Sequence, residues 1–213
     1  MQRFNVLCAN GLAATLDYSV GVFGITLIAT AYDYSIAWWQ ILIGGVLALL
    51  PDFDLQPAVL SGQSAWYDHR QTLLHRPLLV LPLGSVVAYL LGGSFWALAA
   101  FVLILWHYLH DIDWCGTRYG VAWLWPFSRQ YISHYGWFAP PPATDHHEWL
   151  QRHWLQPSQM SITELSVASV FLIITMVMLQ LLQSILPWLV LLMFWLLVYW
   201  LWSQPTGVTH ETD

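Results

Sequence analysis

Two long stretches without any charged residue most constrain how this chain can fold. Residues 77–110 and 165–210 contain no Asp, Glu, Lys or Arg. About 20 apolar residues are enough for a helix to cross the ~30 Å hydrocarbon core of a bilayer, where backbone polar groups must be satisfied within the protein. Charged residues make up only 8% of the whole chain, against about 25% in soluble domains. The sequence therefore predicts an all-α integral membrane protein, with the lipid bilayer as its first partner.

Both charge-free stretches are too long for a single crossing. As one helix, residues 77–106 would be about 45 Å long, so we expect a break at Gly92-Gly93-Ser94. Residues 165–202 have a similar break around residues 183–187, which include a proline. Together with apolar runs at 11–32 and 36–50, these hairpins predict about six transmembrane helices arranged as three hairpins.

The positions of the arginines indicate the orientation in the membrane. The chain has no lysine, and with six helices every arginine lies on the same side as the N-terminus. Basic residues concentrate in cytoplasmic loops, so both termini and the polar segments 52–76 and 111–164 are predicted to be cytoplasmic. No basic patch is present that would bind nucleic acid. The basic residues are Arg3, Arg70, Arg76, Arg118, Arg129 and Arg152.

The domain organisation predicted from this pattern is a single polytopic membrane domain. Within the polar segment, a short helix at 146–155 is expected to lie at the membrane surface, with Trp149, Leu150 and Trp154 facing the bilayer. The C-terminal hairpin is expected to act only as scaffold. The predicted parts of the domain 1–213 are a motif-bearing core at 44–127, an interfacial cover segment at 111–164 and a helical hairpin at 165–203.

Titratable side chains gather where this topology places the cytoplasmic membrane surface. One group follows the second helix, another lies in the next loop, and a third ends the fourth helix, where His107 and Asp111 are four residues apart and share one side. Imidazoles and carboxylates are the ligands of Zn²⁺, and carboxylates also accept Mg²⁺ or Mn²⁺. The sequence therefore predicts a divalent metal site. The residues concerned are Asp52, Asp54, His69, Arg70, His75, His107 and Asp111.

The two aspartates of LPDFDL, residues 50–55, are a notable pair. In an extended segment residues two apart point the same way, so Asp52 and Asp54 would both face one centre. Two carboxylates that close repel each other unless a cation lies beside them. The pair therefore favours a metal site.

Each group also has a simpler explanation. The two aspartates can mark a solvated helix end, His69 and His75 can be ordinary loop residues, and Arg70 can be a topology charge. His107 is harder to explain in this way, because it lies in an apolar run where an ionisable group is costly. The convergence of three groups on one face favours the metal site over these alternatives.

Four motifs in this order resemble those of the YdjM-like family of bacterial inner-membrane proteins, identified as metal-dependent hydrolases. They are LPDFDL, HRQTLLHR at 69–76, HYLHD at 107–111 and GVAWLWPF at 120–127. The resemblance extends from about Gly44 to Phe127. It implies a bacterial inner-membrane location and metal-dependent hydrolysis. Family members often have a histidine near the N-terminus, whereas the first histidine here is His69.

The resemblance also implies which residues form the site. Asp52 and Asp54 match the P-D-x-D pair of the family, His69 and Arg70 its H-R, and His75 the histidine that follows. His107 and Asp111 match its H-x-x-x-D. We expect Zn²⁺ first, with Mn²⁺ or Mg²⁺ as alternatives. The expected metal ligands are Asp54, His69, His75, His107 and Asp111, and the expected catalytic residues are Asp52 and Arg70.

These residue types suit hydrolysis of a phosphoester. A carboxylate such as Asp52 can accept the proton of an attacking water, and the planar fork of Arg70 fits two phosphate oxygens. At the level of the lipid headgroups, a phospholipid or another lipid-linked phosphoester is the expected substrate. The alternative is a non-catalytic metal-binding membrane protein, either a transport component or the membrane partner of a cytosolic protein. A transporter would place polar groups near the bilayer midplane, whereas the charges here gather at one edge.

The predicted topology can be tested with reporter fusions. A reporter fused after Asp213 and another inserted near Pro141 should both report the cytoplasm, because every arginine is predicted to lie on that side. A periplasmic signal from the insertion at Pro141 would contradict the six-helix arrangement.

Overall fold

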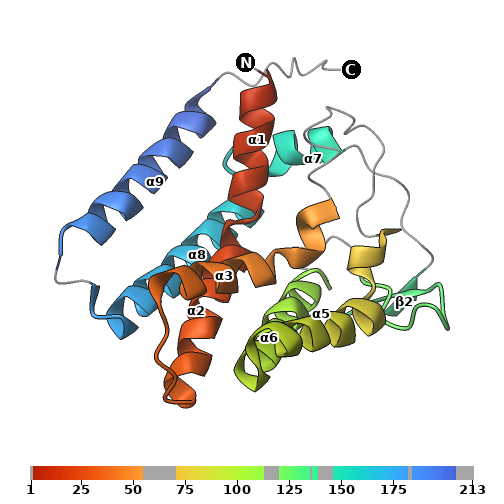
Figure 1. The fold of residues 1–213 in the computed structure, drawn as a ribbon. Helices are drawn as coiled ribbons and strands as arrows, with labels where there is room; N and C mark the ends of the chain where they lie inside the picture. Colours follow the sequence, from red (N-terminus) through yellow and green to blue (C-terminus); the bar gives the residue numbers. More distant parts are fainter. Residues whose placement is uncertain are drawn as a thin grey trace, which may run out of the picture.

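Helices form most of the structure (Figure 1). The computed structural model describes residues 2–54, 71–112, 120–134, 136–138, 146–181 and 184–204. The described elements are α1 (Gln2–Ala13), α2 (Thr15–Ala31), α3 (Trp38–Ala48), η1 (Leu50–Asp54), η3 (Leu73–His75), α5 (Pro77–Gly92), α6 (Ser94–His110), β1 (Tyr131–Ser133), β2 (Gly136–Phe138), α7 (His146–His153), α8 (Gln159–Met178) and α9 (Leu186–Ser203).

The predicted break within each of the two long apolar runs is confirmed. Helix α5 ends at Gly92 and α6 begins at Ser94, so the two helices lie side by side in Figure 1. The residue between them, Gly93, has a φ of 80°, a conformation that glycine adopts without steric cost. In the second run, α8 ends at Met178 and α9 begins at Leu186 with Pro187 in its first turn.

The helices differ in whether they are long enough to cross a membrane. Helices α8 and α9 each qualify by length and composition, and segments Leu7–Ala13 and Thr15–Ala31, bent by 43°, qualify together as a third span. Helices α3, α5 and α6 are apolar but have only 11, 16 and 17 residues, below the roughly 20 needed for a full crossing. The described residues thus support two or three crossings, and six crossings with cytoplasmic termini remain a prediction.

A small β-hairpin adds to the all-α fold that the sequence predicts. Strands β1 and β2 pair antiparallel, with Tyr131 opposite Phe138 and Ser133 opposite Gly136. Residue Val121 forms a further antiparallel bridge with Ile132. This hairpin lies beside the start of α5 (Figure 1).

Glycines allow α2 and α3 to pack closely. A Cβ atom on Gly21 would lie 2.4 Å from the carbonyl oxygen of Gly44 and 2.7 Å from Cα of Gly45. Small residues are the usual means by which membrane helices bring their backbones together. The contact fixes α2 against α3, and thereby places Asp17, one turn before Gly21, on the same side of the molecule as η1.

Helix α7 packs into the protein rather than against the bilayer. The predicted short helix is present, but the side chains of Leu150 and Trp154 are 0% and 1% exposed. They belong to an apolar cluster with Leu12, Leu165 and other residues of α1, α8 and α9. The prediction that these two side chains face the bilayer is therefore wrong, because neighbouring helices cover the apolar face of α7.

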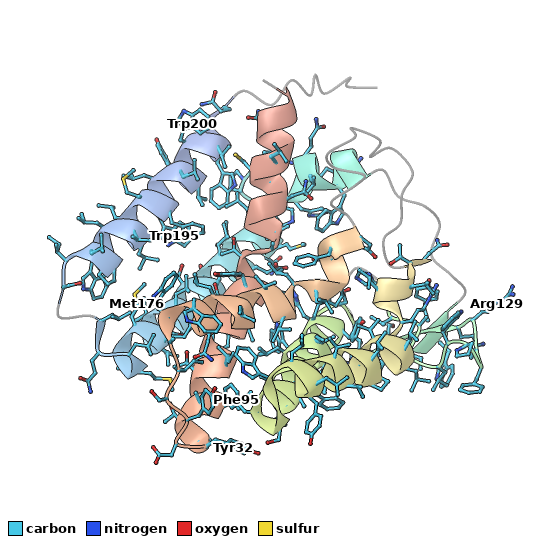
Figure 2. The ribbon with its side chains drawn as sticks, viewed as in Figure 1. Tyr32, Phe95, Arg129, Met176, Trp195 and Trp200 are labelled. Atoms are coloured by element: carbon cyan, nitrogen blue, oxygen red, sulfur yellow. The ribbon has the colours of Figure 1, made fainter. Side chains whose placement is uncertain are left out.

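Figure 2 shows the side chains of the described residues, among which Trp195 and Trp200 lie on α9.

The packing of α2 against α3 can be tested by filling the glycine contact. The substitution Gly21→Leu should lower the free energy of unfolding by about 1–3 kcal/mol, because the new side chain meets backbone atoms of α3. Thermal unfolding of the detergent-solubilised protein measures the effect. Gly11→Ala is the matched control, since a Cβ atom at Gly11 meets nothing within 4 Å. Equal melting temperatures for Gly21→Leu and the wild type would contradict the contact.

Candidate metal centre

The aspartates of LPDFDL lie in a short 3-10 helix, η1, and not in an extended segment. In a 3-10 helix residues two apart differ in direction by roughly 240°, so the expectation that Asp52 and Asp54 point the same way is wrong. They instead contact His75 at its two different nitrogens. Oδ1 of Asp52 lies 3.6 Å from Nε2, and Oδ2 of Asp54 lies 3.3 Å from Nδ1.

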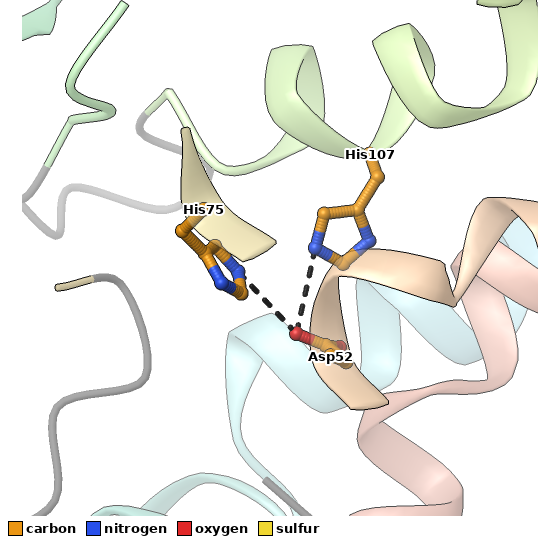
Figure 3. A group of neighbouring side chains, drawn as sticks. All are labelled: Asp52, His75 and His107. Carbon is orange, nitrogen blue, oxygen red and sulfur yellow. Dashed lines mark ion pairs between the residues drawn. The ribbon is translucent and has the colours of Figure 1, made fainter. Parts of the chain in front are cut away.

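Three elements that are distant in sequence bring two imidazoles and a carboxylate together (Figure 3). Asp52 comes from η1, His75 from η3 and His107 from the last turn of α6. Each offers one ligand atom, and these atoms all lie within 4.8 Å of one another. Oδ1 of Asp52 lies 3.4 Å from Nε2 of His107. The group is one that could hold a metal ion.

A second carboxylate faces the same two nitrogens. Oδ2 of Asp111 lies 3.4 Å from Nε2 of His75 and 3.6 Å from Nε2 of His107. Asp111 follows α6 directly and caps its C-terminal end, so the four-residue spacing from His107 brings both side chains to one side, as the sequence predicts. Two imidazole nitrogens and two carboxylates therefore share one small volume. We call the group formed by Asp52, Asp111, His75 and His107 the Asp52–Asp111 centre.

The four nitrogen–oxygen distances between imidazoles and carboxylates in this centre fit a divalent cation. Nitrogen and oxygen ligands of tetrahedral Zn²⁺ at about 2.0–2.1 Å from the metal lie about 3.3 Å from one another, close to the 3.4–3.6 Å separations found here. Nε2 of His107 is buried and makes no hydrogen bond within the described residues. Buried polar atoms in proteins nearly always have a partner, so a cation between these atoms would satisfy His107.

The surroundings of His75 favour positive charge. Burial by itself lowers the pKa of this imidazole, but hydrogen bonds with Asp111, Asp52 and Asp54 outweigh it and raise the pKa to about 10. The position of His75 is fixed from outside the ring, because the Tyr108 hydroxyl on α6 donates a 2.6 Å hydrogen bond to the carbonyl oxygen of Leu74. A divalent cation competes with protons for imidazole nitrogens. Bound here, it would place its positive charge beside the same carboxylates that favour a protonated His75.

Asp54 has a second contact beside the one with His75. The hydroxyl of Thr72 donates a hydrogen bond to Oδ2 of Asp54, the same oxygen that contacts Nδ1 of His75. A carboxylate on the far nitrogen of an imidazole is a common arrangement around metal ligands, where it fixes the ring.

Arg76, the residue after His75, contacts the described segment 120–134. The guanidinium of Arg76 lies over the rings of Trp125 and Tyr131, 5.8 Å from each centroid. Nη1 of Arg76 also donates to the Tyr131 hydroxyl at 3.3 Å. These contacts hold the segment that contains GVAWLWPF against the residue next to His75.

The structure therefore brings together most of the side chains that the sequence predicts. Two of them, His69 and Arg70, lie outside the described residues. The residues brought together are Asp52, Asp54, His75, His107 and Asp111.

Sequence reasoning missed two buried carboxylates beside the centre. Asp17 on α2 and Glu164 on α8 are each 3% exposed and contact His110. Asp17 is the only charged residue between residues 11 and 32. An ionisable residue within a membrane helix is itself a sign of function, and that signal could have identified Asp17. Glu164 lies in the first half of α8, directly before the predicted hairpin 165–203.

Taken together, fold and site define a helical membrane protein with a buried cluster of histidines and carboxylates between its helices. The family model of the YdjM inner membrane protein matches residues 19–207. The match covers most of the chain, and the protein belongs to this family, as its motifs indicate. Comparisons with curated proteins and with solved structures give no match.

Metal binding by the centre can be tested by removing one imidazole at a time. Both His75→Ala and His107→Ala should lower the divalent metal content of the purified protein, because loss of one ligand leaves a weaker site. Elemental analysis after gentle purification measures the stoichiometry. The control is His134→Ala, since His134 is exposed and lies in the turn between β1 and β2. Wild-type protein without metal above background would count against the centre.

Proposed function

We propose that this inner membrane protein is a metal-dependent hydrolase whose reaction takes place at the Asp52–Asp111 centre. The observation that carries the proposal is that Nε2 of His75 and Nε2 of His107 both face the same two carboxylates at 3.4–3.6 Å. His75, His107 and Asp111 hold the metal in this proposal. Three protein ligands leave one position open for water or substrate, as in catalytic zinc sites.

A divalent cation in such a site lowers the pKa of water towards ~7 and polarises a carbonyl or phosphoryl oxygen. Two imidazoles favour Zn²⁺, whereas the carboxylates leave Mn²⁺ and Mg²⁺ as alternatives.

Asp52 is the carboxylate best placed to accept a proton from the attacking water. Its side chain is 26% exposed, against 15% for Asp111 and 9% for Asp54, so water reaches Asp52 most easily. A general base must lie within hydrogen-bond reach of the proton it takes, and Oδ1 of Asp52 already faces both Nε2 atoms.

The sequence predicts Asp54 as a metal ligand, but its contacts support a different role. It meets His75 at Nδ1, the nitrogen that does not face the centre, and it is fixed by Thr72. We therefore propose that Asp54 holds the imidazole of His75 in place. Its Oδ1 atom is buried without a hydrogen bond in the described residues, so direct ligation by Asp54 is the alternative that experiment must separate.

The position of the centre supports a substrate at the membrane surface. Asp52 lies just beyond α3 and Asp111 just beyond α6, so the centre lies where two apolar helices end. A phosphoester in a lipid headgroup, or another lipid-linked phosphoester, would meet it there. We propose that this face is cytoplasmic, and that Arg70, close to His75 in sequence, contacts the phosphate.

The roles of the carboxylates can be separated by amide substitutions. Asp52→Asn should keep the metal but lower turnover by about 10²–10⁴-fold, because an amide cannot accept the proton of water. Asp111→Asn should lower the metal content, and Asp54→Asn should weaken metal binding less than Asp111→Asn. The measurements are elemental analysis and release of phosphorylated headgroup from phospholipid in mixed micelles.

Each result has a clear meaning for the proposal. Loss of metal in Asp52→Asn would make Asp52 a ligand and exchange its role with that of Asp111. Full metal content and full turnover in both Asp52→Asn and Asp111→Asn would contradict a catalytic role for the centre.

A further inference from the structure

A buried carboxylate on α2 lies against the side of His107 that faces away from the metal centre. Asp17 is 3% exposed, and its Oδ2 atom lies 3.4 Å from Nδ1 of His107. This distance is slightly long for a hydrogen bond. Within the described residues, Nδ1 of His107 forms no hydrogen bond. Asp17 is thus the carboxylate placed to accept a hydrogen bond from a protonated Nδ1.

The two nitrogens of His107 therefore face two different kinds of surroundings. Nε2 faces Asp52 and Asp111 in the centre, at 3.4 and 3.6 Å, whereas Nδ1 faces Asp17. A neutral imidazole carries its proton on one nitrogen and can bind a metal only through the other. A carboxylate at Nδ1 favours the proton there and leaves the lone pair on Nε2.

Asp17 is itself held in a fixed orientation. Nε1 of Trp106 donates a 2.9 Å hydrogen bond to Oδ1 of Asp17. Nδ1 of His110 lies 3.0 Å from Oδ1 and 3.2 Å from Oδ2. The other nitrogen of His110, Nε2, lies 3.8 Å from Oε1 of Glu164 on α8, so contacts from α6 and α8 both determine where the carboxylate points.

We propose that Asp17 is a positioning residue for the metal centre, which fixes the tautomer and the ring orientation of His107 so that Nε2 points at the metal. The proposal rests on the metal centre described above. It assigns a role to a residue of α2 that lies outside the residues matched by the family model, 19–207, and outside the motifs of the core segment. It also explains why a membrane helix buries a carboxylate, which is costly unless the group has partners.

Carboxylates that orient metal-binding imidazoles affect metal affinity even though they never touch the metal. Loss of such a partner typically weakens binding about 10–100-fold. A carboxylate with a merely structural role would instead change the stability of the protein and leave the metal affinity of the folded protein unaltered. Metal affinity therefore distinguishes the two roles.

The test uses Co²⁺ as a spectroscopic probe of the full-length protein in detergent. Apo-protein is titrated with Co²⁺, and the visible absorption gives both the dissociation constant and the geometry of the bound ion. Asp17→Ala should raise the dissociation constant about 10–100-fold and change the absorption bands. Asp17→Asn should show a smaller increase, because the amide oxygen can still accept from Nδ1 but carries no charge.

Ser19→Ala is the matched control on the same helix. Ser19 is 0% exposed, and its hydroxyl bonds to the carbonyl oxygen of Thr15 rather than to the histidines. The control should bind Co²⁺ like the wild type. If it loses as much affinity as Asp17→Ala, the effect belongs to α2 in general and the inference is overturned.

The remaining outcomes separate this inference from the proposed function. If wild type and folded Asp17 variants bind Co²⁺ with equal affinity and equal spectra, Asp17 does not position His107, while the metal centre stands. If the wild type itself binds no Co²⁺, the metal centre and the inference both fail. Should Asp17→Ala not fold, Asp17→Asn decides, because its side chain has nearly the same volume.

Discussion

The rest of the structure depends on how two buried imidazoles share two carboxylates. His75 and His107 are each 1% exposed, and their Nε2 atoms face Asp52 and Asp111 together. Burial of ionisable groups is unfavourable unless they are paired or bind a metal. For these four side chains to meet, η1, η3 and the end of α6 must converge at one place, and this requirement explains much of the surrounding architecture.

Contacts outside the centre secure that convergence. The Tyr108 hydroxyl ties η3 to α6 through the carbonyl oxygen of Leu74, and the glycine contact at Gly21 brings α2 against α3. Helix α2 in turn delivers Asp17 to the outer side of His107. Packing between apolar helices and polar contacts at the site are therefore parts of one arrangement, because α6 carries His107 and α2, packed against α3, carries Asp17.

Local features were predictable from the sequence because they follow from short-range rules. The turn at Gly93 was predicted from a pair of glycines in a run too long for one helix, and the shared side of His107 and Asp111 from helical spacing. The family resemblance was predicted from the motif order and is confirmed. These predictions needed no knowledge of how helices pack against one another.

Features that depend on tertiary contacts were not predictable in the same way. The contact of Asp17 with His107 joins residues 90 positions apart on two helices, and nothing in the local pattern of α2 specifies its partner. The 3-10 turn at Asp52 and the burial of Trp154 are likewise set by neighbouring elements. The single charge in an apolar helix marked Asp17 as unusual, but only the fold shows what it contacts.

X-ray absorption spectroscopy of the zinc-loaded wild-type protein tests the central claim most directly. The account predicts a first shell of nitrogen and oxygen at about 2.0–2.1 Å, with the outer-shell scattering of two imidazoles from His75 and His107. A first shell that contains sulfur, or scattering that lacks two imidazoles, would contradict the Asp52–Asp111 centre as the site of metal binding.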